Sequence, residues 1–350
     1  MSPHIVVYTA ITMSVYPDNS MKGWTKSVIL ASRLLLLGAE FRGPSAAILM
    51  YHSVMPDPAQ YVDSLDGIIH SQSSFRQQME MLARDYHPIS LDDLTSKLRT
   101  GRALHRHSVV ITFDDGYSDN YEIAMPILNE LGIPATFYVT VDCIENRRLP
   151  WPSRLRWTLR KTSLARWADS HGNIWSLADS AARQQAFLAA CDDCCRFSGK
   201  IQDEFVDRFE RELDTAVPGS FGSLMMSFDQ LKGLVRHGHI VGSHTMSHPN
   251  MAHITEEEAR RELSESKARL ESGLNSPITH FSYPCPALSP HWNERTVEQC
   301  RTLGYDSAVT ANSGLTKPGD SPLQLKRIHP TKTVPGLRWN LESAFAGRRI

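Results

Sequence analysis

Continuous apolar runs alternate with amphipathic stretches along the first part of the chain. Residues 46–51, 108–113 and 135–141 are apolar nearly throughout, which is the pattern of buried strands. Apolar positions at helical spacing lie between these runs, at about residues 74–84, from about residue 90, and at about residues 118–131. Strands and helices in alternation predict parallel βα units.

The alternation stops at about residue 143 and returns at about residue 222. The segment between these points has a helical pattern, many arginines, and Trp151, Trp157, Trp167 and Trp175. We therefore expect an inserted helical subdomain there. Beyond it the pattern predicts a helix at 227–237, a helix opened by a capping box of Thr255 and Glu258, and strands at about 239–243, 278–283, 305–310 and 324–329.

About seven parallel strands with helices between them favour an α/β fold. We expect a distorted (β/α) barrel of about seven parallel strands with an inserted helical subdomain, rather than an open doubly wound sheet. The predicted organisation is an N-terminal extension (1–45), a barrel (46–335) interrupted by the helical insertion (143–222), and a C-terminal tail (336–350).

Composition narrows the range of partners. The chain has 350 residues, and its 41% hydrophobic content is enough for a large core. Lys and Arg total 37 against 38 for Asp and Glu, so the net charge of -1 argues against general nucleic-acid binding. The expected partner is a locally recognised ligand.

The cysteines and the N-terminal region bear on location. Six cysteines are too few and too unevenly spread for a disulfide-stabilised secreted domain, and the cluster at 191–195 has no second pair at zinc-finger spacing. The expected location is therefore the cytoplasm. Residues 27–38 form an apolar run interrupted by Arg33, which is too short to span a bilayer and leaves peripheral membrane contact open.

Two adjacent carboxylates, Asp114 and Asp115, follow the strand at 108–113 and precede Gly116. In parallel α/β folds the C-terminal strand ends face the active site, although acids before Gly are also ordinary turn residues. A second strand runs into His244, and His248 follows four residues later, a spacing that allows two imidazoles to share one ion. Two histidines and one carboxylate with open positions form the ligand set of a hydrolytic metal site.

These motifs resemble the polysaccharide deacetylase family, the NodB-homology enzymes of carbohydrate esterase family 4. The resemblance covers about residues 46–142 and 223–330. It is carried by Thr112-Phe-Asp-Asp-Gly116, His244-Thr-Met-Ser-His248, Leu49-Met-Tyr-His-Ser-Val54, the stretch from Phe75-Arg-Gln-Gln-Met to Pro88-Ile-Ser-Leu-Asp-Asp-Leu94, and Gly304-Tyr-Asp-Ser-Ala-Val-Thr310.

The resemblance implies a role for each matching residue. It makes Asp115, His244 and His248 the ligands of one divalent metal ion and Asp114 the general base. The family's late-strand histidine, which acts as general acid, corresponds to His329. Zinc is the ion that we expect from these ligand types, although Co, Mn, Fe and Ni also suit them.

The chain departs from the family pattern in its third motif, Phe281-Ser-Tyr-Pro-Cys-Pro286, which lacks the usual Arg and Gly. The family's oxyanion donor, a backbone N–H, would fall on Cys285. Because residues 325, 327 and 329 alternate onto one face of an extended strand, we hypothesise that Arg327 replaces the missing arginine and orients Asp114. A surface arginine is the alternative reading.

Two further groups are candidates for contact with a substrate. Tyr117, beside the acids, and Trp151 offer aromatic faces that a sugar could stack on, although packing is the commoner role of such residues. His52 follows the first strand, where a structural role is favoured over an active-site one.

The resemblance implies a metal-dependent hydrolase that removes an N-acetyl group from an amino sugar in a polysaccharide, glycolipid or related glycan. Two alternatives stay open: a C–N amidohydrolase or deformylase acting on a non-carbohydrate substrate, and a glycan-binding module that has lost turnover. Intact Asp114, Asp115, His244 and His248 argue against the second alternative.

Overall fold

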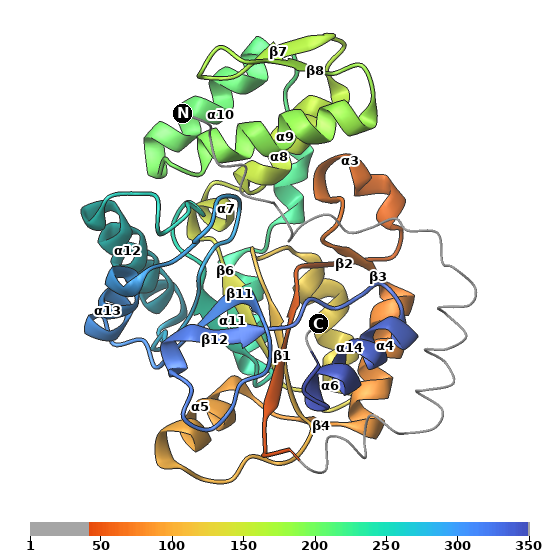
Figure 1. The fold of residues 1–350 in the computed structure, drawn as a ribbon, viewed down its shortest axis with the longest axis vertical. Coiled ribbons are helices and arrows are strands. Elements are labelled where there is room, and N and C mark those ends of the chain that lie inside the picture. The colour runs from red at the N-terminus through yellow and green to blue at the C-terminus, as the bar shows by residue number, and fades with distance from the viewer. Residues whose placement is uncertain (1–41, 349–350) are drawn as a thin grey trace.

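Seven parallel strands form a nearly closed barrel in the computed structural model, which describes residues 42–348 (Figure 1). Their order around the barrel is β1-β5-β6-β9-β10-β11-β12. Ile328, directly after β12, exchanges backbone hydrogen bonds with Ile48 and Met50 of β1 at 2.7 and 3.1 Å, which brings the last strand beside the first. The strands are β1 (Ala46–Tyr51), β5 (Ser108–Phe113), β6 (Ala135–Val139), β9 (Ile240–Ser243), β10 (His280–Ser282), β11 (Ser307–Ser313) and β12 (Leu325–Arg327).

The barrel expected from the hydrophobic pattern is confirmed, with each predicted strand within a few residues of its expected place. Every residue of β1, β5 and β6 is buried, because one side of each strand faces the barrel interior and the other faces the surrounding helices. Three short strands were not expected: β2 (Ser53–Met55), β3 (Ile69–Ser71) and β4 (His87–Pro88).

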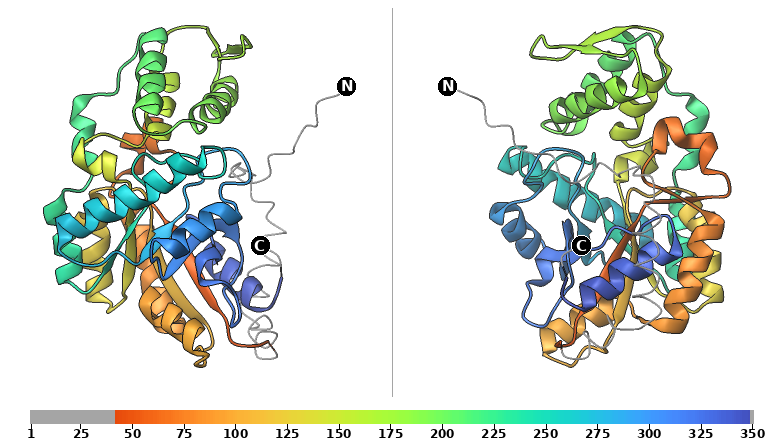
Figure 2. Two further views of the ribbon diagram at one scale, coloured as in Figure 1. Left: turned by 90° about the vertical axis from the view of Figure 1, so that its left-hand side faces the viewer. Right: turned by 45° about the vertical axis from the view of Figure 1, so that its right-hand side comes forward.

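Helices cover the outside of the barrel (Figures 1 and 2). The predicted capping box of Thr255 and Glu258 opens the longest of them. The helix expected at 118–131 starts as a π-helical turn, since Pro126 lacks the N–H that an α-helical bond at this point requires. The helices are α4 (Gln72–Asp85), α5 (Leu91–Thr100), η2 (Asn120–Ala124), α6 (Met125–Glu130), α7 (Val141–Glu145), α11 (Phe228–Arg236), α12 (Glu256–Leu274), α13 (Glu294–Thr302) and α14 (Val334–Phe345).

The inserted segment from α8 to α10, between β6 and β9, projects beyond the C-terminal ends of the barrel strands (Figures 1 and 2). Its helices have a hydrophobic core of their own, separate from that of the barrel. A two-stranded antiparallel hairpin lies beside the helices, which the helical expectation missed because each strand is only three residues long. The elements of this insert are α8 (Trp151–Lys161), β7 (Arg166–Ala168), β8 (Ile174–Ser176), α9 (Ser180–Cys194) and α10 (Gly199–Glu212).

All six cysteines are free, and those at 191, 194 and 195 are buried in the core of the insert. These three side chains therefore pack inside the insert. No group of residues in this cluster has the geometry of a metal site within the part of the chain that the structure describes.

The expected C-terminal tail from residue 336 is wrong for most of its length. Residues 334–345 form α14, and Leu337, Leu341 and Phe345 are buried against the barrel core. These residues recur every four positions, so they form one apolar stripe of a helix. The stripe packs against α4, which makes α14 part of the barrel body.

The apolar run at 27–38, with its expected membrane contact, lies outside the described residues. Within residues 42–348 the structure contains no helix that is both long enough and apolar enough to cross a bilayer.

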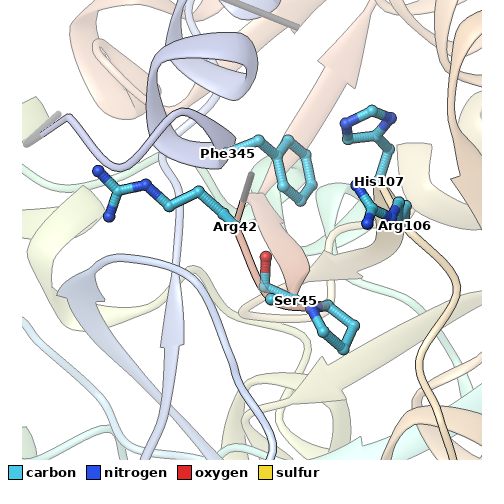
Figure 3. A pocket seen from close by; sticks show the side chains of 7 residues that line it. Arg42, Ser45, Arg106, His107 and Phe345 are labelled. Carbon is cyan, nitrogen blue, oxygen red and sulfur yellow. The ribbon is translucent and has the colours of Figure 1, made fainter. Parts of the chain in front are cut away.

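A small pocket lies at the N-terminal ends of β1 and β5 (Figure 3). It is lined in part by Ser45, Arg106 and His107, which directly precede these strands, and by Phe345 of α14. It is therefore at the opposite end of the barrel from Asp114 and Asp115, which follow β5.

Candidate metal centre

The C-terminal ends of four barrel strands bring the candidate residues together. Asp114 and Asp115 follow β5, His244 follows β9, and Ser282 and Arg327 end β10 and β12. Parallel pairing fixes this arrangement, since Phe113 lies beside Phe137 of β6, and Ser243 beside Phe281 of β10. Residues far apart in the sequence therefore meet at one edge of the barrel.

Asp115, His244 and His248 form a buried cluster whose ligand atoms all lie within 4.8 Å of one another. Oδ1 of Asp115 is 3.6 Å from Nε2 of His244 and 3.5 Å from Nε2 of His248. That oxygen is buried and has no hydrogen-bond partner within the described residues. A buried carboxylate oxygen that is left unpaired between two imidazole nitrogens fits a divalent ion, which would bond to all three.

Burial favours the uncharged forms of these three side chains when no cation is bound. It raises the pKa of Asp115 to about 7, with a further contribution from the negative charge of Asp114. Burial also lowers the pKa of His244 and of His248, so both imidazoles are neutral and able to act as ligands at neutral pH. A bound cation would reverse the effect on Asp115 by favouring its charged form.

The backbone is strained at three places in this centre. Asp115, Thr245 and His248 have left-handed φ values of 76°, 69° and 63°. Each such residue costs on the order of 1–3 kcal/mol, and a β-branched threonine is a particularly rare case. The surrounding structure must therefore hold the segment from His244 to His248 in place.

Glu262 of α12 gives part of this support. Its carboxylate accepts hydrogen bonds from the backbone N–H groups of Met246 and Ser247 at 2.8 and 2.9 Å, and from the Ser247 hydroxyl at 2.6 Å. The Thr245 hydroxyl oxygen accepts a bond from the His248 N–H at 2.9 Å. The loop that carries both histidines is thus bonded at four successive residues.

Asp114 forms a two-pronged ion pair with Arg327. The guanidinium donates to both carboxylate oxygens at 2.8 and 2.7 Å, and both side chains are almost completely buried. Arg327 is oriented in turn by the carbonyl of Thr310 at 2.9 Å and the hydroxyl of Ser282 at 3.1 Å. The arrangement that we hypothesised for Arg327 is therefore present, and the alternative of a surface arginine is excluded.

Burial is the largest single influence on the pKa of Asp114 and raises it. The charge and hydrogen bonds of Arg327, together with the nearby imidazoles of His244 and His52, outweigh burial and hold this pKa well below its usual range. The two neighbouring acids thus differ: Asp114 is kept ionised by an arginine, whereas Asp115 lacks an ion-pair partner other than the two histidines within the described residues. This difference in pKa suits Asp114 as a base and Asp115 as a metal ligand beside it.

The remaining predicted residues have different environments. His329 is exposed directly beyond the end of β12, and partial desolvation and the charge of Arg327 lower its pKa. Cys285 is partly exposed after β10, and its pKa is raised to about 11 by burial of the thiol. That thiol is therefore not a reactive thiolate at neutral pH.

The suggested role of Tyr117 as an aromatic surface for a sugar is wrong. Its ring is fully buried among apolar side chains, and its hydroxyl lies 3.3 Å from that of Ser153. Tyr117 lies four residues beyond the end of β5, where a side chain can face outward or inward, and here its backbone pairs with Met225 and its side chain faces inward. Tyr117 instead supports Asp115, because a side-chain hydrogen bond from it favours the charged carboxylate.

His52 lies near the charged groups of the centre, whereas its sequence position favoured a purely structural role. It is half-buried after β1, and burial, reinforced by the positive charge of Arg327 and opposed by the negative charge of Asp114, lowers its pKa to about 3. Trp151 is buried and donates its indole N–H to the carbonyl of His248 at 2.9 Å. Glu262 carried no motif that could have identified it, since its contacts depend on how α12 packs.

Comparison with known proteins agrees with this geometry. The family model described as polysaccharide deacetylase matches residues 101–188 and 207–308, which include both aspartates and both histidines. The match runs through most of the insert, which lies outside the stretches whose sequence motifs resemble the family, and omits Arg327 and His329. YxkH of Bacillus subtilis (strain 168) is 20% identical over 299 residues, covering 85% of this chain and 75% of YxkH.

Solved structures share the fold. The deacetylase PplD of Streptococcus pyogenes, in complex with acetate, has a TM-score of 0.57 at 19% identity, with 87% of this chain and 99% of PplD covered. IcaB from Ammonifex degensii has a TM-score of 0.55 at 20% identity, with 87% of this chain and 98% of IcaB covered. Since the family model matches more than half of the sequence and spans the buried Asp-His-His cluster, this chain belongs to the polysaccharide deacetylase family.

Proposed function

We propose that this chain is a metal-dependent hydrolase that removes the N-acetyl group from an amino sugar in a polysaccharide, glycolipid or related glycan. The observation that carries the proposal is the buried cluster of Asp115, His244 and His248 next to an aspartate that Arg327 keeps ionised. The neighbour PplD was solved with acetate, which is the small product of deacetylation, and this supports the same chemistry here.

Each residue of the centre has a separate role in amide hydrolysis. Asp115, His244 and His248 would hold the ion, which when bound makes a water easier to deprotonate and polarises the amide carbonyl. Asp114 accepts the proton of the attacking water, and Arg327 keeps the Asp114 carboxylate charged and correctly turned. Zinc is the proposed ion, with Co, Mn, Fe and Ni as alternatives for the same ligands.

The leaving amine requires a proton, and His329 is the proposed donor. It is exposed two residues after Arg327, and it is near enough to His52 to lower the pKa of that imidazole. The backbone N–H of Cys285, in the loop after β10, is the proposed donor to the oxygen that becomes negative during attack.

Acetate release tests the proposed function. Chitooligosaccharides, lipid-linked N-acetylhexosamines and free N-acetylhexosamines are incubated with the protein after metal removal, with and without added zinc. We expect zinc-dependent acetate release from at least one of these substrates. Stoichiometric metal binding without any release would favour a non-carbohydrate amidohydrolase, and absence of metal binding would favour a glycan-binding module.

Replacing Arg327 with lysine should slow the reaction and move its pH profile. Arg327→Lys keeps a positive charge but loses the two-pronged bond to Asp114, so the pKa of Asp114 rises toward that of an ordinary buried carboxylate. As the pH falls, Asp114 then becomes protonated at a higher pH than in the wild type and can no longer act as a base. The acidic limb of the kcat/KM profile therefore shifts to higher pH. We expect a decrease of about 10- to 100-fold in kcat/KM at neutral pH, as for other orienting partners.

A matched control is Arg338→Lys, because Arg338 pairs with Asp85 near the surface. This control should leave both the rate and the pH profile unchanged. An acidic limb in Arg327→Lys that coincides with that of the wild type would contradict the proposed role of Arg327.

Replacing His329 with glutamine should remove the basic limb of the pH profile. A general acid works only while protonated, so activity falls as pH rises through its pKa, and a glutamine has no proton to lose in that range. Loss of general acid catalysis costs typically 10²–10⁴-fold in rate. We expect kcat of His329→Gln to fall by about 100-fold with little change in KM.

The comparison variant is His52→Gln. With a pKa of about 3, His52 is neutral at the working pH and therefore a poor acid. His52→Gln should retain the basic limb. If His52→Gln loses that limb while His329→Gln keeps it, the general acid is His52.

A further inference from the structure

The two metal-site histidines are held in different ways. Nδ1 of His244 lies 2.7 Å from the carbonyl oxygen of Ser282, a bond that fixes the direction of the ring. Nδ1 of His248 is buried and has no hydrogen-bond partner within the described residues. Metal-ligating histidines are usually oriented through their second ring nitrogen, so His248 requires another means of support.

The backbone of His248 provides this support through two hydrogen bonds, and the insert supplies the partner of one of them. The N–H of His248 bonds to the hydroxyl oxygen of Thr245, and its carbonyl accepts the indole N–H of Trp151 at 2.9 Å. Trp151 is the first residue of α8, and its ring lies at 67° to the ring of His248 with centroids 6.3 Å apart. The tryptophan therefore contacts both the backbone and the ring of this ligand.

The insert also bonds to the residues on either side of His248. The N–H of Gly199, at the start of α10, donates to the Ser247 hydroxyl at 2.9 Å, and the carbonyl of Cys195 accepts the Asn250 N–H at 3.1 Å. Three residues of the loop are thus joined to the insert, whereas Glu262 secures Met246 and Ser247 from the barrel side.

The residues that directly follow the altered third motif take part in the same contact. The side-chain amide of Asn250 donates to the carbonyls of Ala287 and Leu288 at 2.6 and 3.0 Å, and these two residues pack against the core of the insert. The loop after β10 therefore rests on the insert and on the histidine loop together.

We propose that the insert is a positioning element of the metal centre, and that the indole N–H of Trp151 sets the direction of the His248 imidazole through the carbonyl of that residue. The carbonyl and the imidazole of His248 are joined through the same Cα, so a shift of the peptide plane that follows His248 would displace the ring, and the left-handed φ of 63° shows that the backbone here is held in an uncommon conformation. The inference rests on the proposed metal-binding role of His248, and it adds a structural purpose for the insert.

The test is metal affinity, measured by competition with a chromophoric chelator, together with the visible spectrum of the Co²⁺-loaded protein. Trp151→Phe removes the N–H and keeps an aromatic ring. We expect roughly 10- to 100-fold weaker metal binding, as for other partners that orient a ligand, and a changed Co²⁺ spectrum. Incorporating the benzothiophene analogue of tryptophan at position 151 keeps the bicyclic shape without the N–H, so it should give the same result even where Trp151→Phe folds poorly.

The matched control is Trp157→Phe on the same helix. Its indole N–H bonds to the carbonyl of Ala216, away from the histidine loop, at 3.3 Å. Trp157→Phe should bind metal as the wild type does. Without metal, the benzothiophene variant at position 151 should have the same melting temperature as Trp157→Phe.

Wild-type affinity and spectrum in both Trp151 variants would overturn the positioning role while leaving the proposed function intact. A wild-type chain that binds no metal would overturn the proposed centre, and the inference with it. Neither result depends on identifying the substrate, so a failed deacetylase assay would not be confused with either.

Discussion

Asp114→Asn is expected to keep the metal and lose nearly all activity. Asparagine has almost the shape of aspartate but cannot accept a proton, so the attacking water loses its base. Removing a general base typically lowers the rate by 10²–10⁴-fold. Asp115, His244 and His248 are unchanged in this variant, so metal binding should remain stoichiometric.

Stability must be measured alongside activity in this variant. Asp114 and Arg327 form a buried pair, and leaving the arginine without its carboxylate costs about 3–5 kcal/mol in comparable cases. The assay therefore uses a temperature at which thermal unfolding shows the variant to be folded.

A suitable control is Asp142→Asn. Asp142 lies on α7 near the histidine loop, but its carboxylate is 3.7 Å from Arg148 and is not directed at the metal cluster. This control should retain most of the activity. Turnover in folded Asp114→Asn at a rate near that of the wild type would show that another group takes the proton.

The barrel could be predicted because strands and helices leave different patterns in the sequence. The strands β1, β5 and β6 are short, mostly apolar runs, and the acids follow directly where the run of β5 ends at residue 113, while His244 directly follows the short strand β9. Parallel strands place these ends at one edge, so the juxtaposition of Asp115 and His244 followed from the fold. The pairing of Arg327 with Asp114 could be anticipated in the same way, from alternation along the last strand.

Other contacts depend on packing that no local pattern contains. Glu262 reaches the histidine loop from the buried side of α12, and Trp151 reaches His248 across almost one hundred residues of sequence. Tyr117 does lie beside the two acids in sequence, but its side chain faces the core and not the substrate. The sequence position alone is compatible with either direction. The sequence analysis did not predict the helix α14, although its apolar residues recur at helical spacing.

His244→Ala is expected to abolish both metal binding and activity. The change removes one of the three protein ligands, leaving Asp115 and His248 only 3.5 Å apart with no third donor in the cluster. Loss of a partner that merely orients a ligand costs 10- to 100-fold in affinity, so loss of the ligand itself should cost more than about 100-fold. Metal should also raise the melting temperature of the wild type but not that of His244→Ala, because only the former binds it in the folded state.

Proton competition gives a second measurement on the same site. In the metal-free protein the pKa of Asp115 is raised to about 7, so below that pH a metal ion must displace a proton to bind. The apparent metal affinity of the wild type should therefore fall by about tenfold for each pH unit below 7. The residual affinity of His244→Ala, where it can be measured, should be far smaller at every pH.

His239→Ala separates the loss of a ligand from the loss of a buried histidine. His239 directly precedes β9, at the end opposite His244, and its ring bonds to Asn129 and to the N–H of Ala135 at 2.9 and 3.2 Å. Removing it should lower the melting temperature while metal binding and zinc-dependent stabilisation persist. If His244→Ala binds metal as tightly as His239→Ala does, His244 is not a ligand, and the cluster at the strand ends must be held together by burial and hydrogen bonds alone.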